Sequence, residues 1–160
     1  MKKICFFLPN LQVGGAEKVM CHIANLLAEN SYRIEFVVVN DHSNKINSIN
    51  KKIKIINLSS MKTIFSFLKF LKYVYREKPD IIISTFNNTS YISSIIKLLF
   101  NRQLKLIIRK PISPMFNLGL IDNLYKFFDP LVHYAANNII VPSSEMRNDL
   151  YKARVFYKKK

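Results

Sequence analysis

The fold of this chain is constrained most by its short runs of consecutive apolar residues. Longer segments, in which apolar residues have helical spacing, separate these runs. The first run, residues 4–8, contains no polar side chain and is closed by Pro9-Asn10. A half-exposed strand alternates apolar and polar residues, so an uninterrupted run predicts a strand that is buried on both faces. Comparable runs recur along the chain. The run over residues 53–58 alternates apolar and polar residues more than the others do. The expected strands cover residues 4–8, 34–39, 53–58, 81–83, 104–108 and 139–141.

The segments between these runs carry apolar residues three and four positions apart, which predicts helices. They cover residues 16–29, 61–77, 91–100 and 118–137, and a last helix begins at Ser143 or Ser144 with Glu145 in its first turn. Strands that alternate with helices predict one α/β domain over residues 1–160, a doubly wound, Rossmann-like parallel sheet with helices on both faces. Ligands of such sheets bind beyond the carboxyl ends of the strands.

The charge of the chain limits its partners. Twenty-five Lys and Arg stand against ten Asp and Glu, for a net charge of +15. This excess favours an anionic partner, such as a phosphorylated ligand or an acidic membrane surface. Nucleic acid is disfavoured because the chain has no nucleic-acid recognition motif. No apolar stretch approaches about 18 residues, and the first run is too short for a signal peptide. We therefore expect a cytoplasmic protein, soluble or peripheral on the inner face of the cell membrane.

Metal and disulfide sites are not expected. Cys5 and Cys21 lack the spacing of metal ligands and indicate buried free thiols. The three histidines, His22, His42 and His133, fall in separate elements and form no cluster. No catalytic residue can be assigned from these patterns.

The Gly14-Gly15 pair joins the first strand to the first helix. Adjacent glycines let a backbone approach a ligand closely, and the helix N-terminus that follows offers free N–H groups to an anion. The same pair could serve only a tight turn, and spacing alone does not separate the two interpretations. The pair belongs neither to a GxGxxG pattern nor to a P-loop, so neither a dinucleotide nor an ATP site is expected.

Polar side chains also follow two later strands. Arg109 and Lys110 end the fifth strand and are candidate contacts for an anionic ligand, although both could be solvated loop cations. Asn87 and Asn88 follow the fourth strand and could bind sugar hydroxyls, but asparagine pairs are favoured in turns, which is the preferred interpretation.

The expected helix over 61–77 has the strongest surface pattern. Its basic side chains, at Lys62, Lys69, Lys72 and Arg76, could face an anionic membrane or only solvent. The opposite face is expected to pack on the sheet through Ile64, Phe67, Leu68, Leu71, Val74 and Tyr75.

Three segments, taken in order, resemble GT4-type glycosyltransferases, which have the GT-B architecture of two Rossmann-like domains facing a cleft. The first is ICFFLP, at 4–9, with GGAEKV at 14–19 and LLA at 26–28. The second is KPDIIIS, at 78–84, and the third is AANNIIVPSS, at 135–144. The resemblance covers nearly the whole chain.

The resemblance implies transfer of a sugar from a nucleotide sugar, the co-substrate, to a lipid-linked or cell-surface saccharide acceptor such as a polyprenyl-linked one. It implies retention of anomeric configuration and no metal or other cofactor. In that family the first domain holds the acceptor. Gly14 and Gly15 would approach the donor diphosphate, and Arg109 or Lys110 would face the reacting sugar or an acceptor phosphate.

The donor-binding second domain of the family, with its paired glutamates, is absent from these 160 residues. We therefore expect this domain to be inactive alone. The alternative is a non-catalytic subunit that recruits the donor half of a split glycosyltransferase to the membrane.

Overall fold

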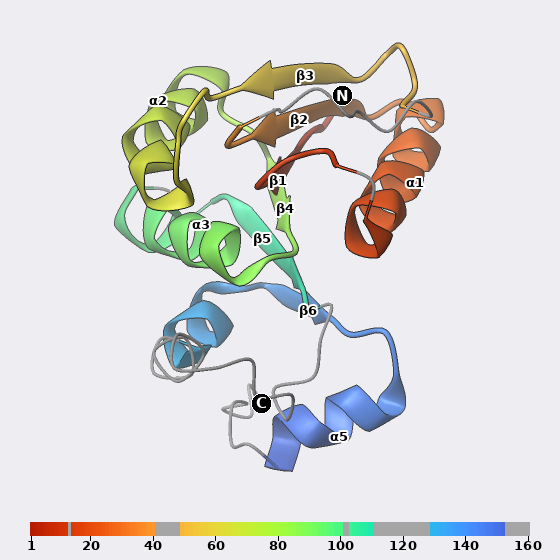
Figure 1. Ribbon diagram of the computed structural model, residues 1–160, viewed down its shortest axis with the longest axis vertical. Coiled ribbons are helices and arrows are strands. Elements are labelled where there is room, and N and C mark those ends of the chain that lie inside the picture. The colour runs from red at the N-terminus through yellow and green to blue at the C-terminus, as the bar shows by residue number, and fades with distance from the viewer. Residues whose placement is uncertain (13, 41–48, 101–102, 111–128, 153–160) are drawn as a thin grey trace.

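The computed structural model (Figure 1) describes residues 1–12, 14–40, 49–100, 103–110 and 129–152. Its strands are β1 (Lys3–Leu8), β2 (Arg33–Val38), β3 (Lys54–Asn57), β4 (Ile81–Ser84), β5 (Lys105–Arg109) and β6 (Asn138–Ile140). Its helices are α1 (Gly15–Glu29), the 3₁₀ turn η1 (Thr63–Ser66), α2 (Phe67–Glu77), α3 (Asn87–Phe100), a segment over 129–135 and α5 (Ser144–Lys152).

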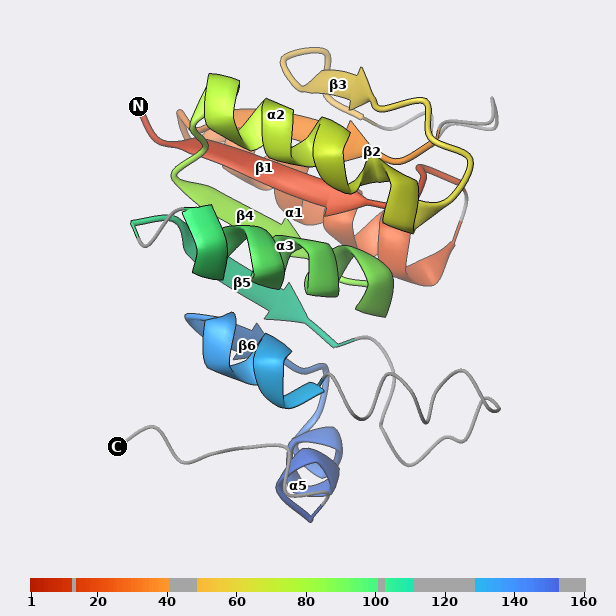
Figure 2. The same cartoon turned by 90° about the vertical axis from the view of Figure 1, so that its left-hand side faces the viewer.

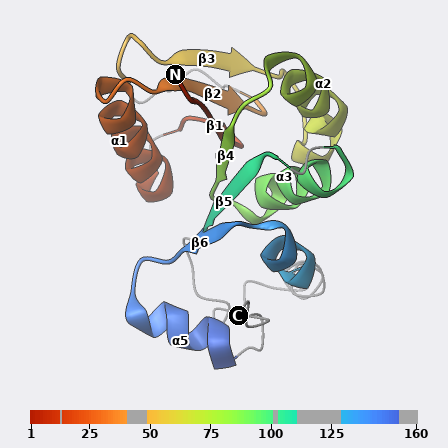
Figure 3. The same ribbon diagram turned by 180° about the vertical axis from the view of Figure 1, so that it is seen from behind.

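The strands form one parallel sheet in the order β3-β2-β1-β4-β5-β6. The chain builds outward from β1 through β2 to β3, then crosses back to β4 beside β1 and builds outward on the other side. Figures 1 and 3 show α1 and α5 on one face of the sheet, with α2, α3 and 129–135 on the other. The predicted doubly wound α/β fold is confirmed.

Alternate residues of the strands pack into two separate hydrophobic cores, one on each face of the sheet, because the side chains of a strand point alternately to its two faces. Phe6 packs toward α1, with Phe36 of the neighbouring strand beside it. Phe7 points the other way and stacks on Phe70 of α2, with ring centroids 3.7 Å apart. Each fully buried ring contributes about 2 to 3 kcal/mol to the free energy of unfolding. Both faces of the sheet are therefore held by aromatic contacts.

One glutamate lies within the second apolar run and is fully buried. Glu35 of β2 accepts hydrogen bonds from Tyr73 Oη at 2.7 Å and from Arg33 Nη2 at 3.0 Å, and Lys3 Nζ lies 3.8 Å away. A buried carboxylate is tolerated when its charge is paired and hydrogen-bonded. This network joins β1, β2 and α2 near the amino edge of the sheet.

The third predicted helix begins earlier than expected. Helix α3 begins at Asn87 rather than at residue 91, and its hydroxyl side chains at Thr89, Ser90, Ser93 and Ser94 are buried. Ser93 Oγ donates to the Thr89 carbonyl at 2.8 Å, and Ser94 Oγ donates to that of Ser90 at 2.7 Å. These bonds to the preceding turn satisfy the hydroxyls, so polar residues are tolerated on a buried helix face.

Other helix ends follow the prediction more closely. Lys78 adopts a left-handed conformation after α2, and the Ser143 hydroxyl accepts from the Met146 N–H at the start of α5. The expected helix over 61–77 is divided into η1 and α2. Of the helix expected over 118–137, residues 118–128 lie outside the described part of the chain. None of the described helices combines the length and apolarity needed to cross a bilayer.

Candidate functional site

The direction in which successive strands are added to the sheet reverses between β1 and β4. These strands are hydrogen-bonded neighbours, with Phe7 opposite Ser84, and both end at the same edge. The chain leaves β1 toward α1 on one face and leaves β4 toward α3 on the other (Figure 1). In doubly wound sheets the ligand binds at such a switch point. The candidate site therefore comprises the described residues at the carboxyl ends of β1, β4 and β5.

Neither glycine of the first connection is required by the fold itself. Gly14 is extended, with φ −127° and ψ 163°, a conformation open to any residue. A Cβ on Gly15 would meet no atom within 4 Å, and one on Gly14 would meet only the flexible end of Glu17. The tight-turn interpretation thus has no steric basis here. Open space beside Gly15 favours the approach of a ligand.

The N-terminus of α1 lies directly behind this pair. The first helical bond runs from the Lys18 N–H to the Gly14 carbonyl at 3.0 Å, and no described side chain caps the preceding N–H groups. The Glu17 carboxylate lies against Gly14, where it neutralises part of the helix dipole. An anionic ligand bound here would displace that carboxylate and accept from the same N–H groups.

Arg109 extends from the end of β5 toward the second connection. Its Nη1 donates to Thr85 Oγ1 at 3.4 Å, a long contact, and Thr85 is almost completely buried. Asn87 is half-buried and Asn88 exposed, and both belong to the first turn of α3 rather than to a separate turn. The structure thus places Arg109 beside the connection that begins α3, one strand away from the switch point.

Lys110 has a different environment from Arg109. Its Nζ lies 2.7 Å from Asp129 Oδ1, and the side chains of both residues are only 9% exposed. Tyr91 Oη donates to the same carboxylate at 3.2 Å. Lys110 therefore joins β5 to α3 and to the segment 129–135.

His133 lies close to this pair, and both of its ring nitrogens are buried. Burial lowers its pKa to about 4, helped by the positive charge of Lys110 and opposed by Asp129. The imidazole is therefore neutral at neutral pH. Sequence spacing could not reveal this cluster, because its members come from three elements.

The basic helix packs on the sheet through only part of the predicted face. Val74 is buried and Phe67 and Leu71 pack against the core, as predicted. Phe70 and Tyr73 are the buried aromatic side chains of α2, whereas Ile64, Leu68 and Tyr75 are exposed. Lys69 Nζ donates to the carbonyls of Leu58 at 2.7 Å and Ser59 at 2.9 Å, so this lysine anchors the preceding loop. The other three predicted basic side chains, Lys62, Lys72 and Arg76, are exposed.

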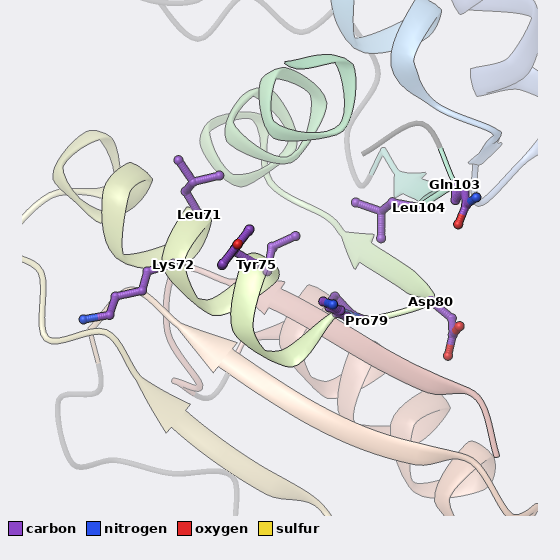
Figure 4. Close-up of a pocket in the computed structure, with 9 residues that line it drawn as sticks. Leu71, Lys72, Tyr75, Pro79, Asp80, Gln103 and Leu104 are labelled. Atoms are coloured by element: carbon purple, nitrogen blue, oxygen red, sulfur yellow. The ribbon is translucent and has the colours of Figure 1, made fainter. Parts of the chain in front are cut away.

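A pocket of about 750 Å³ lies between α2 and the amino ends of β4 and β5 (Figure 4). Leu71, Tyr75 and Leu104 provide apolar walls, and Asp80 and Gln103 lie near its far side. It lies at the edge of the sheet opposite to the switch point. In the described part of the chain, no group of three or more His, Cys, Asp or Glu could hold a metal ion.

No family model matches the chain, and no curated protein matches it in sequence. Solved structures do match. A sucrose-phosphate synthase from Thermosynechococcus elongatus is similar over 95% of this chain and 45% of its own, with 12% identity and a TM-score of 0.75. A lipopolysaccharide outer core galactosyltransferase is similar over 94% of this chain and 42% of its own, with 13% identity and a TM-score of 0.67.

A UDP-GlcNAc 2-epimerase from Methanocaldococcus jannaschii is also similar, over 96% of this chain and 43% of its own, with 12% identity and a TM-score of 0.63. The chain thus spans less than half the length of each of these proteins. At such identities the likeness concerns the fold, which is shared by transferases and an epimerase. The chain has a doubly wound, Rossmann-like fold that matches one half of a GT-B architecture.

Proposed function

We propose that residues 1–160 are the acceptor-side domain of a GT4-type glycosyltransferase, which transfers a sugar from a nucleotide sugar to a lipid-linked or cell-surface saccharide. The observation that carries this proposal is the switch point, where the N-terminus of α1 at Gly14-Gly15 follows β1 and Arg109 ends β5, two strands along the same sheet. The likeness to sugar transferases supports it. The reaction would take place at the cytoplasmic face of the membrane.

The chemistry requires stabilisation of the negative charge that gathers on the leaving diphosphate. The N–H groups at the start of α1 and the guanidinium of Arg109 are suited to this, because the helix N-terminus carries a partial positive charge and the guanidinium a full one. The Glu17 carboxylate would move away from Gly14 when the diphosphate binds. Gly15 leaves room for a phosphate to approach the backbone. Asn87, at the start of α3, would hydrogen-bond the acceptor. A second domain would hold the nucleotide, without a metal.

The test is a transfer assay on the complete native protein. UDP- and GDP-sugars are offered with polyprenyl-diphosphate saccharides, and release of nucleoside diphosphate is measured. We expect release that depends on an acceptor. Conversion of UDP-GlcNAc to its 2-epimer, or no reaction with any donor, would overturn the proposal.

A pair of variants on one strand tests the role of Arg109. Arg109→Gln, at the carboxyl end of β5, is expected to lower kcat/KM by about 10²-fold, the usual effect of losing one charge-stabilising donor. Lys105→Gln, at the amino end of the same strand, is exposed and serves as the matched control. Equal rates for the two variants would remove Arg109 from the site.

The size of the native protein, detected with an antibody to this domain, separates the main proposal from its alternative. A species of roughly twice this chain's length would contain both domains of the enzyme and would favour the main proposal. A species of this chain's own length would instead favour a subunit that recruits a separate donor half.

A further inference from the structure

Five large apolar side chains are exposed just before η1, on η1 and along α2. Met61, Ile64, Phe65, Leu68 and Tyr75 are between 65% and 93% exposed. Leu68 and Tyr75 are seven residues apart, which places them on the same side of α2, and Met61, Ile64 and Phe65 come directly before that helix. We call these five residues the apolar stripe. A group of large apolar side chains this exposed is typical of an interaction site rather than of an ordinary solvated face.

The surroundings of the stripe are strongly basic. Residues 58–78 contain five basic residues and a single acidic one, Glu77, whose carboxylate is bound to Lys3. Lys62 and Lys72 are exposed next to the stripe in sequence, as are Arg76 and Lys78 near its far end. The stripe therefore combines apolar side chains with a positive rim.

The orientation of the stripe relates it to the candidate site. Helix α2 runs antiparallel to the strands, so its beginning and η1 lie at the carboxyl edge of the sheet, as Figure 2 shows. The connections that carry Gly15, Asn87 and Arg109 emerge at the same edge. The residues of the stripe in η1 and at the beginning of α2 thus lie toward the edge at which the acceptor is expected, whereas Tyr75 lies toward the amino edge.

We propose that the apolar stripe inserts into the interfacial region of an anionic lipid bilayer, with Lys62 and Lys72 bound to lipid headgroups. The charge of the rim selects this occupant. A second copy of the chain, packed stripe to stripe, would bring two sets of basic side chains together, whereas anionic lipid complements both the apolar and the charged part. The proposal goes beyond sugar transfer and does not depend on it.

The experiment is vesicle flotation of the complete native protein. Vesicles of phosphatidylcholine alone are compared with vesicles that also contain phosphatidylglycerol, at low and at high salt. We expect binding only to the anionic vesicles, weakened by salt because the rim contribution is screened.

Two matched pairs of variants locate the surface. Ile64→Gln with Leu68→Gln is expected to lower the partition coefficient about 100-fold, roughly tenfold for each apolar side chain withdrawn from the interface. The control, Val19→Gln with Leu26→Gln, replaces exposed apolar residues of α1 on the other face of the sheet. We expect it to bind as the parent does. All four positions are exposed, so folding should be preserved, and circular dichroism checks this.

The second pair tests the rim. Lys62→Gln with Lys72→Gln is expected to weaken binding about 25-fold, at roughly fivefold for each basic residue. Lys51→Gln with Lys52→Gln removes the same charge at the turn before β3 and should leave binding nearly unchanged.

Three results would overturn the proposal. One is no binding to anionic vesicles, and another is an equal loss of binding in the α1 control. The third is a dimer in sedimentation that Ile64→Gln with Leu68→Gln dissociates, without vesicle binding, which would assign the stripe to self-association. Because flotation requires no sugar donor, its outcome is independent of the transfer assay.

Discussion

Replacement of Asp129 by asparagine should strongly destabilise the fold. The variant keeps an oxygen that can accept from Lys110 and Tyr91, so it removes mainly the negative charge. The Lys110 Nζ, 2.7 Å from the carboxylate with its side chain only 9% exposed, is then a buried cation without its counter-charge. Losing one partner of a buried pair costs about 3 to 5 kcal/mol, and the retained oxygen places this variant near the lower value, about 3 kcal/mol.

The assay is urea and thermal unfolding followed by circular dichroism at neutral pH. A loss of about 3 kcal/mol corresponds to a decrease in Tm of about 10 °C for a domain of this size. The double variant Lys110→Met with Asp129→Leu removes both charges and should recover most of the loss, since a buried pair can be exchanged for apolar groups at little cost. A decrease of less than about 1 kcal/mol in Asp129→Asn would refute the reasoning, as would a double variant no more stable than the single one.

Three further predictions follow from the described contacts. Gly15→Ala should leave the free energy of unfolding unchanged or raise it by up to about 1 kcal/mol. Sugar transfer by the complete protein should fall about tenfold, because the added methyl group would contact the donor diphosphate. A lower stability in urea would show instead that the fold needs this glycine. His133, with its pKa lowered to about 4, binds a proton less readily when folded than when unfolded. Stability should therefore decrease as the pH falls from 6.5 toward 4, by about 2 kcal/mol for this partly exposed ring, and urea titrations at several pH values should show a smaller dependence in His133→Asn. Phe70→Ala should cost about 3 to 5 kcal/mol, because it leaves a cavity under the ring that stacks on Phe7; a cost below about 1 kcal/mol in chemical unfolding would mean that the core closes around the gap.

The order of strands and helices was open to prediction because its signal is local. A continuous apolar run such as 4–8 reports burial on both faces without reference to any partner. The same holds for the end of α2 before Lys78-Pro79 and for the cap at Ser143. Helix boundaries were harder to predict where a turn pattern and a helix pattern compete. In α3 the polar residues at its start are typical of a turn, and only the hydrogen bonds of its serine hydroxyls to preceding carbonyls show why they are tolerated in a helix.

The phase of α2 shows why a periodic pattern can identify only part of the buried face. Ile64 and Leu68 fit the expected apolar side as well as Phe67 and Leu71 do. The 3₁₀ turn of η1 advances differently from an α-helix and shifts the earlier residues relative to the later ones. Phe70 and Tyr73 then face the sheet, where they find Phe7 and Glu35.

The residues of the candidate site also divide into those that the sequence could predict and those that it could not. Gly14-Gly15 and Arg109 could be nominated from the sequence, because a helix start and the end of a strand are local features whose common edge follows from a parallel sheet. The separation of Arg109, which reaches Thr85, from Lys110, which is buried against Asp129, could not. The sequence by itself thus determined the layered fold and the edge at which to look for a ligand. Only the tertiary structure decided which charges are paired and which apolar side chains remain exposed, because both depend on contacts between residues that are distant along the chain.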